Sequence, residues 1–192
     1  TCTQMGKGER LVPGVTNRIY VSATRRNGDP ADYTAQVWCG ENMRGEVSSV
    51  HEGRGRTTIV PKVGETCELR IIEPAGVLPS PIALPAVADG AIFTTLNDTF
   101  SANDEQVAVR LGIHSQNNAL DGVYVVGLYS KDLRVAASKV WYSHADSGGV
   151  LEQDVALHVA HNSRGNETGV LRMTLTRILG QSTALIGERL IF

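Results

Sequence analysis

The sequence is poor in aromatic residues, which make up 5% of its 192 positions, and it carries no excess of basic charge. Its formal net charge is −2 at pH 7. Nucleic-acid-binding domains usually carry clustered Lys and Arg, and single-strand binders add stacking rings. Here Arg25 and Arg26, and Arg54 and Arg56, form only small local clusters. The composition therefore argues against nucleic acid as a partner.

Long apolar runs are also missing. None approaches the roughly 20 residues that a membrane-spanning helix needs, so we expect no direct membrane insertion. The N-terminus lacks the basic and then apolar pattern of a secretory signal, which indicates a mature or excised segment. A chain of this length can bury a core as one large domain or as two small ones.

Helical patterns are nearly absent, and alternation of apolar and polar residues takes their place. This alternation has the period of a half-buried strand. The alternating or β-rich segments are 18–24, 33–39, 67–72, 106–113, 122–130, 134–142, 150–159, 169–179 and 184–192. Segments rich in Gly, Pro, Asn and Asp separate those of the first half, and such residues form turns; they are 26–30, 40–45, 52–55 and 61–65. We predict an all-β chain of two tandem antiparallel β-sandwiches of the immunoglobulin or fibronectin kind.

A proline-rich stretch, "AGVLPSPIALPAVADG", follows the first set of strands. Pro79, Pro81 and Pro85 have no backbone N–H to donate to a sheet, which favours an extended linker or an edge segment. We therefore predict a first sandwich at residues 1–76 and a second, larger one at 77–192 that begins with a proline-rich linker.

Cysteine is scarce, with Cys2, Cys39 and Cys67 as the three residues of this type. Cys39 and Cys67 both fall on the apolar faces of predicted strands, so they are either a disulfide or two buried thiols. A bond across 28 residues would stabilise the fold by roughly 3 to 4 kcal/mol on the chain-entropy model. We favour the disulfide. We expect Cys2, near an unstructured start, to pair outside the segment or to remain free.

Motifs that would carry chemistry are missing from the sequence. "WCGEN" resembles the Cys-Gly-Glu-Gln motif of internal thioesters, but Asn42 stands where the glutamine would be, so a strand ending in a glycine turn is the better interpretation. His158 and His161 are spaced for opposite faces of a strand, which does not suit a zinc site. No nucleophile elbow, calcium loop or phosphate loop occurs. We expect no catalytic residue, metal site or cofactor.

Two kinds of surface position remain. Asn97 in "NDT" and Asn166 in "NET" are possible glycosylation sequons in a secreted eukaryotic protein. Trp38 and Trp141 each fall on the polar side of a predicted strand, where an aromatic ring can anchor a partner. We treat these tryptophans as a possible interface.

The order of the turn motifs resembles that of the alpha-2-macroglobulin family. "VPGVTNRIYVSATRRNGDPAD" and "HEGRGRTTIVPKVGETCELRIIEP" are similar to consecutive stretches of that family, and "GVLRMTLTRILGQSTALIGERLIF" is similar to the close of its following domain. The likeness covers residues 11–74 and the C-terminal strands, whereas residues 77–168 match only in strand rhythm.

This resemblance implies two consecutive macroglobulin-like domains of a longer secreted or cell-envelope protease inhibitor, without its bait or thioester. The expected role is a non-enzymatic scaffold. Its partners would be neighbouring domains of the parent chain and, through the whole protein, target proteases. The rival hypothesis is an immunoglobulin-like adhesion or receptor module that binds a protein or glycan. Packing against a neighbouring domain explains the two tryptophans better than a ligand does.

Overall fold

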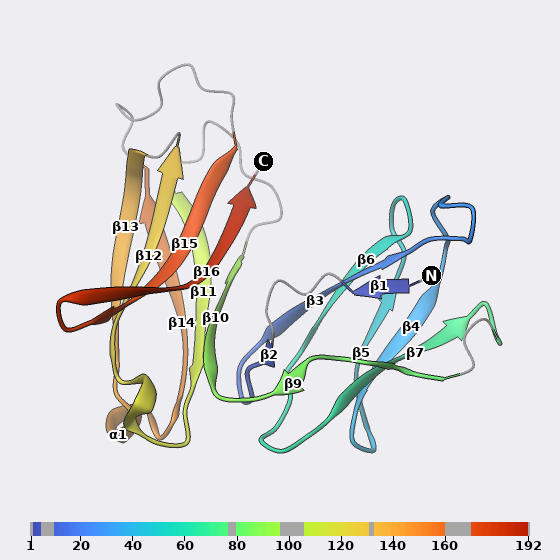
Figure 1. The fold of residues 1–192 in the computed structure, drawn as a ribbon, viewed down its shortest axis with the longest axis horizontal. Helices are drawn as coiled ribbons and strands as arrows, with labels where there is room; N and C mark the ends of the chain where they lie inside the picture. Colours follow the sequence, from blue (N-terminus) through green and yellow to red (C-terminus); the bar gives the residue numbers. More distant parts are fainter. Residues whose placement is uncertain are drawn as a thin grey trace. The chain divides into compact units, whose positions relative to one another are not determined.

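The computed structural model of the chain consists almost entirely of β-strands. It describes residues 2–4, 10–76, 80–96, 106–130, 133–159 and 170–191. The chain divides into two compact units, Thr1–Asp89 and Gly90–Phe192. In each unit the strands lie in layers (Figure 1). The all-β prediction is confirmed, with one parallel strand pair added to the antiparallel sheets.

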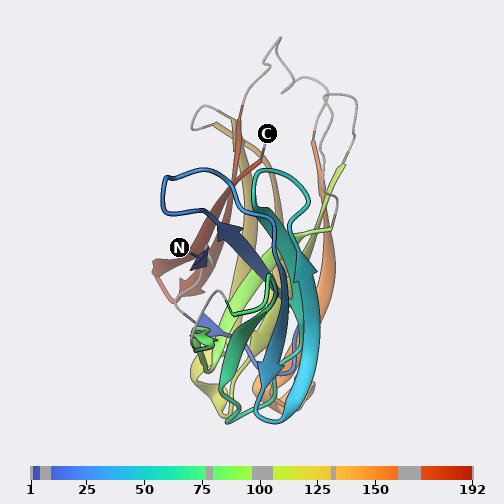
Figure 2. The same ribbon diagram turned by 90° about the vertical axis from the view of Figure 1, so that its right-hand side faces the viewer.

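The first unit contains two antiparallel sheets, each named here after a central strand. The β3 sheet has the order β1-β3-β6, formed by Cys2–Gln4, Asn17–Ala23 and Arg54–Ile59. The β4 sheet has the order β5-β4-β7-β8, formed by Asn42–Ser48, Thr34–Cys39, Cys67–Glu73 and Ile82–Ala83. Strands β2 (Arg10–Leu11) and β9 (Ala86–Val87) form the parallel pair. Figure 2 shows these strands, coloured blue to green, from the side.

The core of the first unit lies between these sheets and follows the alternation of the sequence. Ile19 and Val21 point inward from β3, and Ala35, Val37 and Cys39 point inward from β4. The buried Tyr33 side chain crosses the interior, and its hydroxyl donates to the carbonyl of Val21 at 3.1 Å.

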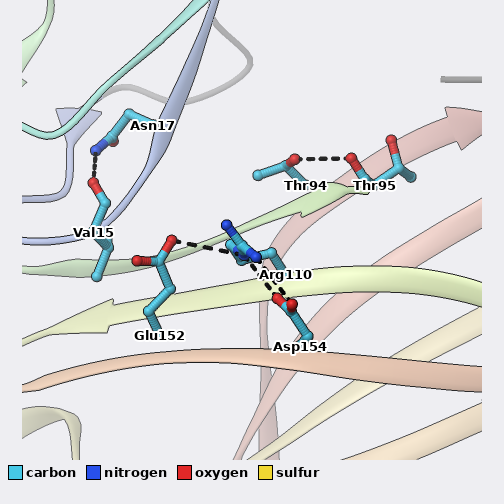
Figure 3. A network of polar contacts seen from close by, with 7 residues as sticks. All are labelled: Val15, Asn17, Thr94, Thr95, Arg110, Glu152 and Asp154. Carbon is cyan, nitrogen blue, oxygen red and sulfur yellow. Dashed lines mark hydrogen bonds and ion pairs between the residues drawn. The ribbon is translucent and has the colours of Figure 1, made fainter. Parts of the chain in front are cut away.

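Asn17 braces the bend that precedes β3. Its side chain is buried, accepts from the backbone N–H of Val12 at 2.8 Å, and donates to the carbonyls of Val12 and Val15 at 2.7 and 2.8 Å. The contact with Val15 is drawn in Figure 3. A buried amide with three backbone partners satisfies groups that would otherwise be costly to bury. The "VPGVTN" motif is therefore a folded bend with its own internal support.

One predicted turn is shorter than expected. We assigned 40–45 to a turn, but Asn42–Ser48 is strand β5, which pairs with β4 in a hairpin. The turn is confined to Gly40 and Glu41, and Gly40 has a φ of 57°, which favours glycine. Residues 42–45 lack strict alternation because much of this strand is exposed on the sheet margin. The spacing of apolar residues alone therefore does not predict strand β5.

The boundary predicted at residue 76 is also displaced. The chain divides after Asp89, because residues 80–89 belong to the first unit. Strand β8 pairs with β7, the Leu84 N–H donates to Cys67 O at 2.9 Å, and the Ala88 N–H donates to Leu11 O at 2.9 Å. Pro81 and Pro85 flank these short outer strands, where a missing N–H is tolerated. Most of the proline-rich segment that was predicted to be a linker therefore forms an edge of the first unit.

The second unit is a sandwich of two antiparallel sheets. The β11 sheet has the order β10-β11-β14, formed by Gly90–Thr95, Gln106–His114 and Val150–His158. The β12 sheet has the order β13-β12-β15-β16, formed by Leu133–Tyr142, Gly122–Ser130, Leu171–Leu179 and Ser182–Ile191. Two short turns of helix, η1 (Asn118–Leu120) and α1 (His144–Ser147), lie between strands. Every strand that the sequence predicts here is present, and β10 is added.

Apolar side chains fill the interior of the second unit. Leu111, Leu128, Met173 and Leu175 are fully buried between the two sheets. Tyr124 extends this core, and its hydroxyl donates to the carbonyl of Leu120 at 2.8 Å. Burial raises the pKa of Tyr124 to about 12, so the phenol stays protonated and keeps this donor. The interior is therefore a packed core with satisfied polar groups at its margin.

The turn at 61–65 is held by a carboxylate. Glu65 accepts from the backbone N–H of Lys62 at 2.8 Å and from Arg44 on β5 at 2.6 Å. The hydrogen bond from Lys62, followed by the guanidinium of Arg44, lowers the pKa of Glu65 below its ordinary value of 4.5. Because the folded-state pKa is depressed, this stabilisation is present above about pH 4.5 and is lost as the pH falls through the folded-state pKa.

We predict that Glu65→Gln lowers the free energy of unfolding at pH 7 by about 1 to 2 kcal/mol, since charge-assisted hydrogen bonds are lost. The difference from the wild type should shrink at pH values below the folded-state pKa. Urea unfolding at a series of pH values measures both effects. Glu46→Gln, at an exposed position of the same strand β5, is the matched control and should change stability by under about 0.5 kcal/mol. A difference that is independent of pH would contradict the assignment.

Candidate functional site

The β12 sheet has an inner face that is buried and an outer face that carries the more exposed of the two tryptophans. Tyr124, Val126, Val140 and Met173 alternate inward, which leaves their neighbours on the outer side. Trp141 is among these neighbours, and it is 65% exposed.

Strand pairing places four apolar side chains on the same face of the β12 sheet as Trp141, spread over strands β12, β15 and β16. Val123 lies directly opposite Trp141, and Ile178 lies directly opposite Val123 on the next strand. One row further on, Val125 and Leu185 flank Thr176 across two strands. Side chains directly opposite on neighbouring strands are in contact range, so Val123 can contact both Trp141 and Ile178. Thr176 lies between Val125 and Leu185, and the exposed Lys139 lies opposite Val125. We call Val123, Val125, Trp141, Ile178 and Leu185 the Trp141 patch.

Part of this face outside the patch is covered by its own side chains. The Tyr129 ring lies over Gly127, where a Cβ atom would come within 2.8 Å of the ring. Arg172 stacks on Tyr129 at 5.2 Å and approaches Glu188 at 3.9 Å. Leu185 in the patch is 61% exposed, whereas Val123, Val125 and Ile178 are half-buried. Contiguous exposed apolar side chains mark a surface that another molecule or domain covers.

The outer face of the β11 sheet is charged instead. Arg110 donates to both carboxylate oxygens of Asp154 at 2.7 and 2.9 Å, and Glu152 lies 3.9 Å away (Figure 3). The hydrogen bond from Arg110 lowers the pKa of Asp154, and the same bond raises the pKa of Arg110. An ion pair on an exposed face contributes at most about 1 kcal/mol. This face is therefore an ordinary solvated surface.

Trp38 has a different environment from Trp141. It points outward from β4, as the sequence predicted, but Arg70 stacks on its ring at 4.5 Å. Arg70 is itself paired with Glu68 at 2.6 Å, and the indole N–H of Trp38 donates to Gln36 at 3.2 Å. The ring is covered by its own sheet, so the structure favours a packing role for Trp38 and leaves Trp141 as the open position.

Cys39 and Cys67 form the disulfide that we favoured. They lie opposite each other on the neighbouring strands β4 and β7, and both are buried. The Cys39 sulfur is used in this bond, and the strand ends in the glycine turn at Gly40, as predicted for "WCGEN". Cys2 lies on strand β1, which corrects the unstructured start that we expected.

The remaining predictions concern metal binding, membrane insertion and glycosylation. Within the described ranges, no three His, Cys, Asp or Glu residues are placed to hold a metal ion. In the same ranges, none of the helices has the length and apolar character needed to cross a membrane. The sequons at Asn97 and Asn166, and also His161, lie outside the described residues.

Four patch residues escaped the sequence analysis because their strands pair through contacts distant in the chain. Val123, Ile178 and Leu185 belong to three different strands, and only the sheet order places them on one face with Trp141. Their strands were predicted, but the order was not. The usable signal was the apolar residue on the outer side of each strand, where a solvated sheet would carry a polar one.

No protein-family model matches the chain, and no curated protein matches it. Among solved structures, all of this chain aligns with 95% of domains 5–6 of the S-layer protein SbsC, at 15% identity and a TM-score of 0.45. It also aligns in full with 14% of the E. coli alpha-2-macroglobulin chain, at 8% identity and a TM-score of 0.34. A third match is to 97% of the D0-D1 domains of intimin, at 11% identity and a TM-score of 0.33.

Proposed function

We propose that the chain is a non-enzymatic scaffold segment of a larger secreted or cell-envelope protein of the alpha-2-macroglobulin type. The observation that carries this proposal is the Trp141 patch, an apolar surface on the outer face of the β12 sheet in which Trp141 and Leu185 are exposed. Apolar surfaces of this kind are typical of contacts that are permanent. The occupant is another domain of the same parent chain, which would cover the patch with an apolar surface of its own.

The buried disulfide supports the location. Cys39 and Cys67 are bonded in the core of the first unit. Structural disulfides persist outside the cytoplasm, in the periplasm, at cell surfaces and in secretions. An envelope or extracellular protein is therefore the setting in which this unit keeps its bond.

The architecture supports a positioning role. Each unit has its own core, so each is a rigid body that can hold other parts in place. The "VPGVTN" motif, on which the family resemblance depends in part, forms the bend braced by Asn17. Trapping a protease would belong to other domains of the parent protein.

The test compares the accessibility of Trp141 in two settings. Hydroxyl-radical labelling with mass spectrometry is applied to the isolated chain and to the full-length parent protein. We expect Trp141 to be labelled in the isolated chain and strongly protected in the parent. Trp38, which Arg70 covers in its own sheet, is the internal reference and should label equally in both.

Equal labelling of Trp141 in both settings would contradict the scaffold proposal. Protection that appears only when a protein or glycan ligand is added would instead favour the adhesion module. A second arm assays protease trapping, which we expect from the parent and not from this segment. Inhibition of a protease by the segment alone would also contradict the proposal.

A further inference from the structure

The connection between β3 and β4 contains the only Asn-Gly pair of the sequence, Asn27–Gly28. The Gly28 N–H donates to the carbonyl of Arg25 at 3.0 Å, and the Arg25 N–H donates to the carbonyl of Asp29 at 2.7 Å. Gly28 has a φ of 92°, a backbone conformation that favours glycine. Residues 25–29 are all exposed. The Asn-Gly bond therefore lies in a tight turn that solvent reaches.

The side-chain amide of Asn27 is held by Asp29 at both of its polar atoms. Its Oδ1 accepts from the backbone N–H of Asp29 at 3.2 Å, and its Nδ2 donates to the Asp29 carboxylate at 2.6 Å. An N–H that donates to a carbonyl oxygen stabilises the negative charge that forms there when a nucleophile attacks the carbon. The Asn27 carbonyl is therefore polarised, and its nitrogen lies beside a carboxylate.

The nucleophile within reach of this carbonyl is the backbone nitrogen of Gly28. Its attack on Asn27 Cγ closes a succinimide ring within the chain. Glycine has no Cβ to crowd this nitrogen, and even a Cβ placed on Gly28 would meet no atom within 4 Å. The space around the bond is therefore open to the movement that ring closure needs.

We infer that Asn27 is a site of spontaneous deamidation. The Gly28 nitrogen bonds to Asn27 Cγ and gives up its proton, the Cγ–Nδ2 bond breaks, and ammonia leaves with that proton. One water molecule then opens the ring. Opening at Cγ gives aspartate at position 27, and opening at the main-chain carbonyl carbon gives isoaspartate. Neither step needs an oxidant or a reductant.

The other asparagines of the described ranges are placed less well for this reaction. Asn17 is buried, and its amide bonds to three backbone groups. Asn42 is exposed, but it lies within strand β5 and is followed by a methionine. Asn117 and Asn118 precede residues that carry a Cβ. Asn27 therefore combines exposure, a polarised carbonyl and a following glycine.

Both products would change the turn. Aspartate at position 27 replaces the amide nitrogen, now 2.6 Å from the Asp29 carboxylate, with a second negative oxygen, and such like charges repel. Isoaspartate lengthens the main chain inside a turn that two backbone hydrogen bonds close. Either product also makes the net charge one unit more negative than −2. Deamidation would therefore loosen this turn in the first unit.

The test incubates the folded chain at a series of pH values from mildly acid to mildly alkaline. Peptide mass spectrometry with electron-transfer fragmentation measures conversion at each asparagine and separates aspartate from isoaspartate. We expect Asn27 to convert at least about tenfold faster than Asn42, since alignment of the reacting atoms governs such rates. The rate should rise with pH, because the Gly28 nitrogen must lose its proton to attack.

Two variants locate the reaction, with ammonia release as the readout. Asn27→Gln lengthens the side chain by one carbon, so that attack by the Gly28 nitrogen would need a larger ring, and it should remove most of the release. Asn42→Gln is the matched control, and it should release ammonia as the wild type does. Unfolding midpoints verify that both variants are folded.

A chain unfolded in urea is the reference for the effect of the turn. Conversion of Asn27 in urea but not in the folded chain would overturn the inference, because the turn would then protect the bond. Equal rates at Asn27 and Asn42, or unchanged ammonia release from Asn27→Gln, would also overturn it. The labelling test of the Trp141 patch does not depend on these results, so the scaffold proposal and this inference fail separately.

Discussion

Replacing Cys39 and Cys67 together with valine is expected to lower the free energy of unfolding of the first unit by roughly 3 to 4 kcal/mol on the chain-entropy model. The bond closes a loop of 28 residues that includes β5 and β6. Without it, the unfolded chain gains the freedom of that loop. Valine keeps most of the apolar volume at two buried positions, so the loss of the cross-link dominates.

The two tryptophans allow each unit to be observed separately. In a Trp141→Phe background, Trp38 reports unfolding of the first unit, and in a Trp38→Phe background, Trp141 reports the second. Urea unfolding should show a much lower midpoint for the first unit of the double valine variant. The second unit is the internal control, and its midpoint should stay within error of the wild type. Equal midpoints for the first unit in both proteins would contradict the stabilising role of the bond.

Asn17→Ala should cost about 3 kcal/mol, because it removes three hydrogen bonds and leaves buried backbone groups of Val12 and Val15 without partners. The affected transition is that of the first unit, measured as above. Asn27→Ala is the matched control, since its side chain bonds to Asp29 in an exposed turn. We expect the control to change stability by less than about 1 kcal/mol.

A second variant distinguishes the donors of Asn17 from its acceptor. Asn17→Asp retains an oxygen for the N–H of Val12 but turns another oxygen toward the carbonyls of Val12 and Val15. At pH 7 the carboxylate should cost at least as much as alanine does. At acid pH the protonated group supplies one donor, so part of the stability should return. A stability equal to that of the wild type at pH 7 would contradict the brace.

The alternation of apolar and polar residues predicted the strands well. Each strand buries one face, and this pattern can be seen within the strand's own sequence. β3, β12 and β14 all have the predicted ends to within one residue. Strand β5 was lost because its exposed position at the sheet margin leaves no alternation to detect. The boundary was misplaced because prolines suit an edge strand as well as a linker, and the sequence alone does not decide between them.

The candidate surfaces depend on sheet order, which is a non-local property. Trp38 and Trp141 look alike in the sequence, since each alternates with buried residues. Their difference comes from a neighbouring strand, because Arg70 on β7 lies over the Trp38 ring, whereas the residue opposite Trp141 on β12 is the apolar Val123.

The parallel pair of β2 and β9 sets how the first unit would respond to tension. These strands lie close to the two ends of the unit, and Arg10 and Leu11 run beside Ala86 and Val87 in the same direction. Force pulling the ends of the chain apart would slide one strand along the other, loading their backbone bonds together.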